Sequence, residues 1–332
     1  MIKVLVIDDA YFLRFTLANF LNSDPSMKAF TAKDYEEAMQ KLKLHPDVII
    51  LSIDMKRISC LDILHNIMDA QPVPVIITSS TNDLSSHEVL TAFEYGAFDF
   101  IAKPKRNSKI MDMKEELIAL VKTAASVEIK KLSLEQRGKI GRFPQHSNKI
   151  VVLGASSGGP TAIEFILKSL PKGFPAFLLV VQHMPPGFTK TFAERLNKRC
   201  AISVKEAEQG ERMVQGKALV APGGFALEIL SKDNGAKVRL KKEREELMPC
   251  IDTALKSIAQ VFKDDVIAVI LTGMGQDGSN GAEEVKKYQG VVIAQDERTS
   301  VVFGMPKAVI ERGHADHVLS LDRIPKKIME LM

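Results

Sequence analysis

The length, composition and charge of the chain exclude several classes of protein. At 332 residues the chain is too long for one ordinary domain, and the usual size of about 100–200 residues per domain predicts two. Its 45% apolar and 26% charged residues match folded globular proteins and exclude a disordered or fibrous class. The net charge of +4 is small and the two signs alternate along the chain, so nucleic acid is not an expected partner.

Neither a targeting segment nor membrane insertion is predicted. The start, MIKVLVIDDA, has too short an apolar run for a signal peptide, and no uninterrupted apolar stretch approaches the roughly 20 residues that span a bilayer. We therefore expect a cytoplasmic protein. Cys60, Cys200 and Cys250 lie far apart without a C-x-x-C pair, so neither a disulfide framework nor a thiolate metal site is expected.

The first third of the chain has the pattern of βα units around a parallel sheet, because short apolar runs alternate with amphipathic segments. Strict alternation of five strands with five helices predicts a flavodoxin-like domain with a five-stranded parallel sheet over residues 1–122. The predicted strands are Lys3–Ile7, Met27–Thr31, Val48–Leu51, Val75–Thr78 and Phe98–Ile101. The predicted helices are Tyr11–Leu21, Tyr35–Lys43, Cys60–Met68, Ser86–Tyr95 and Asn107–Lys122.

The apolar rhythm fades over residues 123–148, where basic residues accumulate, and this favours a solvated linker. A basic docking site is the alternative, although charge runs usually just keep a segment in water. From Lys149 the alternation resumes and continues to the C-terminus. Its middle part, Val204–Leu240, has Gly-rich turns and an alternation typical of β-hairpins. Residues 149–332 are thus predicted to form a Rossmann-like, doubly wound α/β domain with a β-hairpin insertion.

Polar side chains follow the predicted strands of the first domain, at the edge where functional groups gather in such sheets. They are Asp8, Asp9, Ser52, Thr78 and Lys103, the last followed by Pro104. This ordered combination resembles the receiver domain of two-component response regulators. The resemblance implies an acidic pair that holds Mg²⁺, an aspartate after the third strand that accepts phosphate, a Thr or Ser that senses the phosphate, and a Lys that pairs with it.

The phosphoacceptor position departs from that pattern. The run LSIDM places Ser52 where the receiver pattern has aspartate, and Asp54 lies two residues further on. A neutral hydroxyl lacks the carboxylate that coordinates Mg²⁺. A shift of two residues moves a side chain about 6–7 Å along a strand, so Asp54 is expected to miss the metal. We predict a degenerate receiver that regulates through protein contacts.

A serine-containing turn follows the first strand of the second domain. The strand Ile150–Leu153 runs into GASSGGP, where Ser156 satisfies G-x-S-x-G, the strand-to-helix turn that exposes a nucleophilic hydroxyl. The Ser157 N–H at the helix start can face a developing oxyanion. On the turn alone, a structural Gly-rich turn is an equally good interpretation. A phosphate loop is disfavoured because Pro160 replaces the required lysine, and a dinucleotide-binding turn because Ser156 replaces a glycine.

Two further loops supply the partners of a hydrolase site. His183 directly follows the apolar strand Phe177–Gln182, and Asp277 lies in a Gly-rich loop after the strand Val266–Leu271. A lone histidine is usually structural. Here the carboxyl ends of neighbouring parallel strands converge, so an imidazole can serve as base to Ser156 and a carboxylate can orient it. These residues predict a Ser-His-Asp triad.

The second domain carries a series of short motifs, GASSGGP, QHMPPGFT, EAEQGERM, ALVAPGG, ILTGMGQDG and VVFGMP. In this order they resemble the catalytic domain of chemotaxis response-regulator methylesterases (CheB), from Lys149 to the C-terminus. The resemblance implies that Ser156 is the nucleophile, His183 the general base and acid, and Asp277 the orienting carboxylate. It also implies that the Met274 N–H is an oxyanion donor.

The same resemblance implies substrates and partners. The family substrate is the γ-glutamyl methyl ester on methyl-accepting chemotaxis receptors, some members also deamidate receptor glutamines, and no metal or organic cofactor is needed. A chemotaxis histidine kinase is the implied partner of the receiver, which in the family covers the catalytic cleft until it is phosphorylated. With Ser52 at the acceptor position, both constitutive or partner-controlled activity and permanent inhibition remain open. A catalytically weak signalling adaptor and an NTPase are the competing functions.

Overall fold

The structure is a computed structural model that describes residues 1–55, 59–80, 83–103, 110–111, 113–127, 147–230, 235–242 and 249–332. The chain divides into two compact units, Met1–Lys131 and Leu132–Met332. Most of the predicted linker, together with Pro104, lies outside the described residues, so the linker at 123–148 stays a prediction. Within the described ranges, no helix is both long and apolar enough to cross a membrane.

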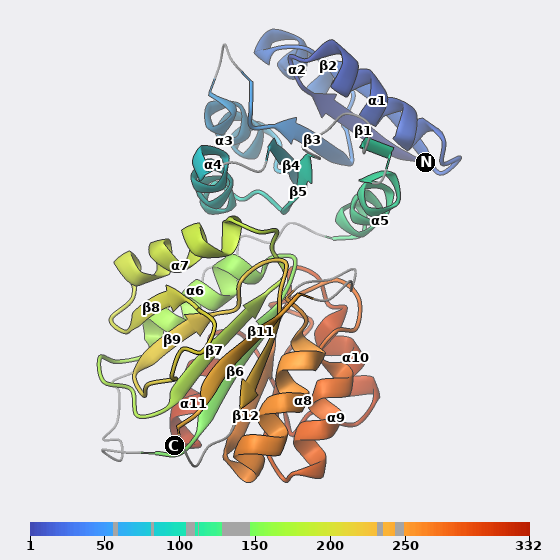
Figure 1. Cartoon of the computed structure of the whole chain (residues 1–332). Helices are drawn as coiled ribbons and strands as arrows, with labels where there is room; N and C mark the ends of the chain where they lie inside the picture. The colour runs from blue at the N-terminus through green and yellow to red at the C-terminus, as the bar shows by residue number, and fades with distance from the viewer. Residues whose placement is uncertain are drawn as a thin grey trace. The chain divides into compact units, whose positions relative to one another are not determined.

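The first unit is built on a five-stranded sheet with strand order β2-β1-β3-β4-β5, in which every neighbouring pair is parallel (Figure 1). This is the flavodoxin-like order that the alternation predicted. The strands are β1 (Ile2–Ile7), β2 (Met27–Ala32), β3 (Val48–Ser52), β4 (Val75–Ser80) and β5 (Asp99–Lys103). The helices are α1 (Tyr11–Asn22), α2 (Tyr35–Leu42), α3 (Cys60–Ala70), α4 (Asp83–Glu94) and α5 (Lys114–Ala125).

The central strands of this sheet are apolar because helices cover both of their faces. Every residue from Val48 to Ser52 in β3 is buried, while α1 packs against α5, and α3 packs against both α2 and α4. Helix α5 begins later than the predicted start at Asn107, and residues 104–109 lie outside the described part of the chain.

The second unit contains a seven-stranded parallel sheet with the order β14-β13-β12-β6-β7-β9-β8. Strand β6, the first strand of this unit in sequence, lies in the middle of the sheet. The chain first adds β7, β8 and β9 on one side of β6 and then crosses to add β12, β13 and β14 on the other side. Its strands are β6 (Ile150–Ala155), β7 (Phe177–Gln182), β8 (Ser203–Glu206), β9 (Lys217–Val220), β12 (Val266–Ile270), β13 (Val291–Gln295) and β14 (His317–Leu319).

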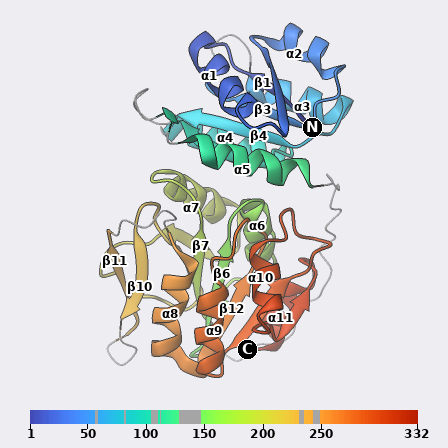
Figure 2. The same cartoon turned by 90° about the vertical axis from the view of Figure 1, so that its right-hand side faces the viewer.

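Helices cover both faces of this second sheet, which confirms the doubly wound arrangement (Figure 2). Helix α8 packs against α9, and α9 against α10, while α6 packs against α7 and α11. The helices are α6 (Gly159–Ser169), α7 (Phe188–Arg199), α8 (Ile251–Phe262), α9 (Ser279–Lys287), α10 (Met305–Glu311) and α11 (Ile324–Glu330), with a short 3-10 helix at Lys263–Asp265.

The predicted hairpin insertion is confirmed, but it is shorter than the segment Val204–Leu240. Among the strands that the structure describes, only β10 (Ala226–Leu230) and β11 (Lys237–Lys241) pair in an antiparallel direction. Strands β8 and β9 join the edge of the main sheet as parallel strands. Short strands with Gly-rich turns give the same sequence pattern in a hairpin and at the edge of a parallel sheet. The alternation of side chains does not specify the direction of the partner strand.

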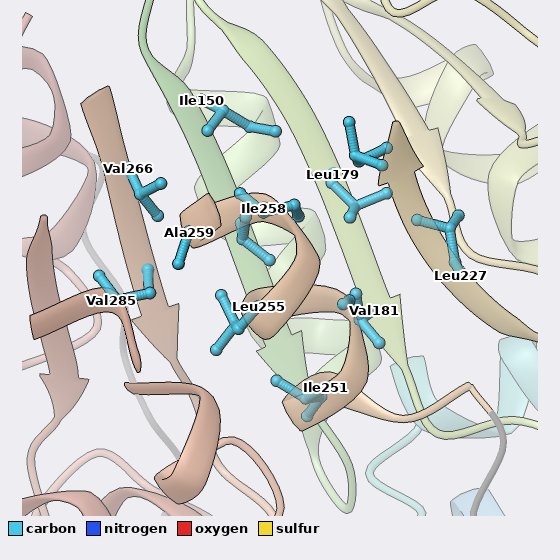
Figure 3. Packing of buried hydrophobic residues seen from close by; sticks show 14 of the residues in the cluster. Ile150, Leu179, Val181, Leu227, Ile251, Leu255, Ile258, Ala259, Val266 and Val285 are labelled. Atoms are coloured by element: carbon cyan, nitrogen blue, oxygen red, sulfur yellow. The ribbon is translucent and has the colours of Figure 1, made fainter. Parts of the chain in front are cut away.

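Helix α8 is fixed to the sheet by an apolar face with helical spacing. Ile251, Leu255 and Ile258 are fully buried and face residues of β6, β7 and β12, including Ile150 and Val266 (Figure 3). Truncation of such a side chain to alanine typically costs about 2–5 kcal/mol. The start of α8 is therefore held rigidly at the carboxyl edge of the sheet.

The strand order creates one edge suited to a site. Strand β6 pairs with β7 on one side and with β12 on the other, so the winding direction changes beside β6. In open α/β sheets, ligands bind outside the carboxyl ends of the strands at such a switch point. The loops that follow β6, β7 and β12 carry Ser156, His183 and Asp277.

Candidate active site

Ser156 is held at the turn between β6 and α6. Its N–H donates to the Thr272 carbonyl at 3.0 Å, which ties the turn to the loop after β12. The next positions require glycine: Gly158 has φ of 75°, and a Cβ there would lie 2.6 Å from Val301 Cβ. Helix α6 then begins at Gly159, with Pro160 in its first turn. This strand-turn-helix geometry matches the context that a nucleophile elbow requires.

His183 lies beside this turn at the end of the neighbouring strand. Ala155 pairs with Gln182 in the register of β6 and β7, and the His183 N–H donates to the Ala155 carbonyl at 3.1 Å. Ser156 and His183 are therefore the first residues past two adjacent strand ends, and adjacent strands are about 4.8 Å apart. No hydrogen bond joins the Ser156 hydroxyl to the His183 ring among the residues that the structure describes, so this half of the triad stays a prediction.

The side chains of His183 and Asp277 are in direct contact in the structure. The His183 Nε2 and Asp277 Oδ2 atoms are 2.7 Å apart, and both side chains are about nine-tenths buried, at 9% and 10% exposed. A carboxylate can only accept, so Nε2 is the donor in this contact, and Nδ1 is the ring nitrogen that Asp277 does not engage. Nδ1 is therefore the atom that would take a proton from Ser156.

Backbone N–H groups fix the Asp277 carboxylate. Its oxygens accept from the N–H groups of Ile251 at 2.8 Å and Asp252 at 2.9 Å, at the start of α8. Burial raises the pKa of Asp277, but hydrogen bonds from His183 and from these two N–H groups outweigh burial and leave the pKa below its usual value. Asp277 is therefore ionised at neutral pH, as an orienting carboxylate must be.

The loop that contains Met274 packs directly against Ser156. A Cβ on Gly273 would lie 2.8 Å from the Ser156 Cβ, so only glycine allows this approach. The VVFGMP segment anchors the loop, because the Gly273 N–H donates to the Val302 carbonyl at 3.0 Å and the Gly273 carbonyl accepts from the Met305 N–H at 2.9 Å. The positions of Met274 and of Ser157, in the turn before α6, are compatible with the predicted oxyanion donors, which remain predictions.

Two buried glutamines were not recognised from the sequence. Gln182, 2% exposed, donates from Nε2 to the carbonyls of Ser156 at 2.9 Å and His183 at 3.2 Å. Gln295 Oε1 accepts from the Thr272 N–H at 2.8 Å. Each glutamine ends an otherwise apolar strand, FLLVVQ and VVIAQ. The signal that could have identified them is a polar residue at the end of an apolar strand. A buried amide needs hydrogen-bond partners, so such a residue is expected to bond to nearby loops.

In the first unit, the predicted pocket gathers around Lys103. Its ammonium lies 2.7 Å from the Ser52 hydroxyl and 3.3 Å from the Asp8 carboxylate. The sequence predicts that Asp54 lies too far along the chain to reach a bound metal. It does reach Lys103, because the Asp54 carboxylate is 3.0 Å from the same ammonium. The chain turns immediately after β3, so the distance along an extended strand does not apply.

The other pocket residues flank this cluster. Asp9 is exposed at the end of β1, and the buried Thr78 pairs with Ser52 in the register of β3 and β4. Among the described residues, no group of three or more histidine, cysteine, aspartate or glutamate side chains is placed to hold a metal ion. The Lys103 ammonium neutralises Asp8 instead. At the position where the receiver pattern implies a carboxylate ligand for Mg²⁺, Ser52 offers only a neutral hydroxyl, which does not fit that ligand set.

The fold and this edge of the second sheet together define a class of protein. A serine at a strand-to-helix elbow, beside a hydrogen-bonded histidine and aspartate on neighbouring strand ends, is the arrangement of a serine hydrolase on an α/β sheet. A flavodoxin-like unit precedes it. Comparison with known proteins identifies the family: the CheB methylesterase model matches residues 151–328, and the response regulator receiver domain model matches residues 4–115. The chain belongs to the CheB methylesterase family and has an N-terminal receiver domain.

Individual relatives agree with this assignment over the whole length. The chain is 42% identical over 341 residues to the protein-glutamate methylesterase/protein-glutamine glutaminase of Thermotoga maritima, an alignment covering 100% of this chain and 98% of the relative. The protein of the same name from Pyrococcus horikoshii is 40% identical, covering 99% and 93%. The crystal structure of the Thermotoga maritima CheB methylesterase catalytic domain matches with a TM-score of 0.55 and 49% identity, covering 56% of this chain and 100% of that one.

Proposed function

We propose that Ser156, His183 and Asp277 hydrolyse γ-glutamyl methyl esters on methyl-accepting chemotaxis receptors in the cytoplasm. Family membership identifies the enzyme class as protein-glutamate methylesterase/protein-glutamine glutaminase. The observation that carries the residue assignment is the 2.7 Å contact between His183 and Asp277, located beside the Ser156 elbow at the switch point of the sheet. We include receptor glutamine amides as substrates, because the relatives are named for both reactions.

The proposed reaction passes through an acyl-enzyme. His183 Nδ1 takes the Ser156 proton as the hydroxyl oxygen attacks the ester carbonyl, and the Ser157 and Met274 N–H groups stabilise the oxyanion. The carbon–oxygen bond to the methoxy group then breaks, and His183 returns its proton to the departing methanol. A water molecule then attacks the acyl-enzyme while His183 takes its proton. The bond to Ser156 Oγ breaks, His183 returns the proton to that oxygen, and glutamate is released. Asp277 stabilises the imidazolium in both halves.

Methanol release from methylated receptor membranes tests this assignment. Ser156→Ala should reduce release to the background rate, because no other group supplies the nucleophile. Ser169→Ala is a matched control, since Ser169 ends the same helix α6 and its hydroxyl donates to the Phe165 carbonyl at 2.9 Å. Undiminished release by Ser156→Ala would refute the nucleophile. Ammonia release from receptor glutamines, measured with the same variants, tests the amide reaction.

We further propose that the receiver domain is degenerate and is not switched by an acyl-phosphate. The support is Ser52 at the acceptor position and the Lys103 ammonium, which is already paired with Asp8 and Asp54. Regulation then depends on protein contacts, with a chemotaxis histidine kinase as one partner. Incubation with a small-molecule phosphodonor and Mg²⁺ should leave the chain unmodified, whereas Ser52→Asp should gain Mg²⁺-dependent phosphorylation. Stable phosphorylation of the unmodified chain would contradict the proposal.

A further inference from the structure

The starts of helices α8 and α9 exchange capping carboxylates. Asp277, which precedes α9, accepts from the N–H groups of Ile251 and Asp252 in the first turn of α8, at 2.8 and 2.9 Å. In return, Asp252 Oδ1 accepts from the N–H of Gly278, the N-cap residue of α9, at 2.9 Å and from the N–H of Gly281, in the first turn of α9, at 2.6 Å. Each aspartate therefore caps the helix that carries the other.

This exchange arises because neither helix supplies its own cap. The residues at the N-cap positions are Cys250 for α8 and Gly278 for α9, and neither makes a side-chain capping hydrogen bond to its own helix. The first N–H groups of a helix lack intrahelical partners, and a carboxylate there also interacts favourably with the helix dipole. The two aspartates satisfy these N–H groups reciprocally.

Close packing makes the exchange possible. A Cβ on Gly281 would lie 2.6 Å from the Leu255 Cβ and 3.2 Å from the Asp252 Cα, so only glycine lets the two helix starts approach this closely. Leu255 and Ile251 are fully buried and hold α8 on the sheet. Asp252 therefore sits on a fixed helix, from which its carboxylate reaches the start of α9.

We propose that Asp252 is a positioning residue that holds Asp277 in line with His183, an inference that rests on the proposed role of Asp277. The peptide N–H of Gly278, the residue directly after Asp277, is shared between Asp252 Oδ1 and Asp277 Oδ1, each at 2.9 Å. Asn280 adds a third bond, from Nδ2 to Asp252 Oδ2 at 2.8 Å. Loss of Asp252 would remove the bonds that tie Gly278 and Gly281 to α8 and leave the Gly278 N–H to Asp277 alone. A displacement of 1 Å in a catalytic group can reduce the rate by about 100-fold.

An aspartate at the opposite edge of the same sheet provides a matched control. Asp316 accepts from the Val292 N–H at 2.8 Å and pairs with Lys286, near the start of strand β13, far from the carboxyl ends of the strands. Asp316→Asn should lower thermal stability by weakening the pair with Lys286, and leave kcat unchanged. A loss of kcat that occurs in the Asp252 variants and not in Asp316→Asn then indicates that Asp277 has been displaced.

The experiment is a double-mutant cycle in the full-length chain, with kcat and KM of methanol release and the Tm of each variant measured. Asp252→Ala should lower kcat by about 100-fold with little change in KM. Asp277→Asn should lower kcat by about 10⁴-fold. The double variant should be no slower than Asp277→Asn alone, because Asp252 acts through Asp277 and residues that act as a unit are not additive.

Asp252→Asn covers the case in which the alanine variant does not fold. The amide keeps an oxygen for Gly278 and Gly281 but turns an N–H group toward the Asn280 amide, so we expect about a tenfold loss of kcat. The low-field proton resonance of the His183 Nε2–H should shift in this variant. Wild-type kcat with an unshifted resonance would overturn the inference.

The remaining outcomes separate this inference from the proposed function. Multiplicative losses in the double variant would show that Asp252 acts independently of Asp277, which contradicts the positioning role. Retained kcat in folded Asp252→Ala, together with a slow Asp277→Asn, overturns the inference and leaves the triad intact. Wild-type kcat in Asp277→Asn instead overturns the triad assignment itself.

Discussion

The chain contains two clusters of polar side chains at the carboxyl edges of parallel sheets, and they differ in how charge is balanced. In the receiver unit, the Lys103 ammonium is paired with Asp8 and Asp54, and it also donates to Ser52. In the catalytic unit, the Asp277 carboxylate is held by backbone N–H groups and a histidine. Backbone N–H groups fix a carboxylate without cancelling its charge, so Asp277 can still stabilise an imidazolium. The comparison indicates that a lysine balances the carboxylates at one sheet edge, whereas backbone N–H groups hold a carboxylate that keeps its charge at the other.

The largest expected effect tests the catalytic side of this comparison. Asp277→Asn preserves shape and should lower kcat of methanol release by about 10⁴-fold, because an amide neither fixes the required tautomer nor stabilises the imidazolium. Steady-state kinetics on methylated receptors measure the loss. If the variant turns over within tenfold of the wild type, Asp277 does not have the orienting role.

The second prediction tests the receiver side. Lys103→Met leaves Asp8, 1% exposed, without its cation, and breaking a buried ion pair in this way costs about 3–5 kcal/mol. Asp54→Asn should cost less than about 1 kcal/mol, since partly exposed pairs contribute little; the Asp54 side chain is 28% exposed. Urea unfolding of the receiver unit measures both. Equal losses in the two variants would show that the pocket is not anchored by the buried Asp8.

The third prediction concerns Gln182, the buried glutamine bonded to the Ser156 and His183 backbone. Gln182→Leu removes the donor to the Ser156 and His183 carbonyls, and the resulting displacement should lower kcat by up to about 100-fold. Gln215→Leu is the control, because Gln215 likewise donates to a backbone carbonyl, that of Ser147, at 2.6 Å. It precedes the start of β9, away from the carboxyl edge. Equal rates for the two variants would exclude a role for Gln182 in positioning.

The smallest expected effect is a pH dependence of stability. Burial raises the pKa of Asp277, but the hydrogen bonds from His183, Ile251 and Asp252 lower it by more than burial raises it. The pKa therefore lies below its usual value. A depressed pKa stabilises the fold above the unfolded-state value of about 3.9 and loses that contribution as the pH falls through the folded-state value. The difference in unfolding free energy between wild type and Asp277→Asn should therefore shrink as the pH falls below about 4. A constant difference down to strongly acid pH would contradict the assigned carboxylate environment.

Much of the fold could be predicted because it depends on local patterns. Strands buried on both faces appear as short apolar runs, such as VIILS in β3 and VIAVI in β12, and both were predicted within one or two residues. The elbow could be predicted because glycines stand at fixed spacing around Ser156. The structure gives the reason for Gly158, where a Cβ would lie 2.6 Å from Val301 Cβ. His183 and Asp277 could be selected because each follows such a strand, and the structure joins them by a hydrogen bond.

The amino-acid sequence by itself determined the two α/β units and the residues that end their strands. Only the tertiary structure decided that β8 and β9 extend the parallel sheet, that Asp54 reaches Lys103, and that Asp252 and Asp277 exchange caps. Burial and turn preferences act between residues close in sequence and leave a periodic pattern. The capping aspartates are 25 positions apart, and contacts at such a distance depend on how the helices and strands pack, which no local pattern records.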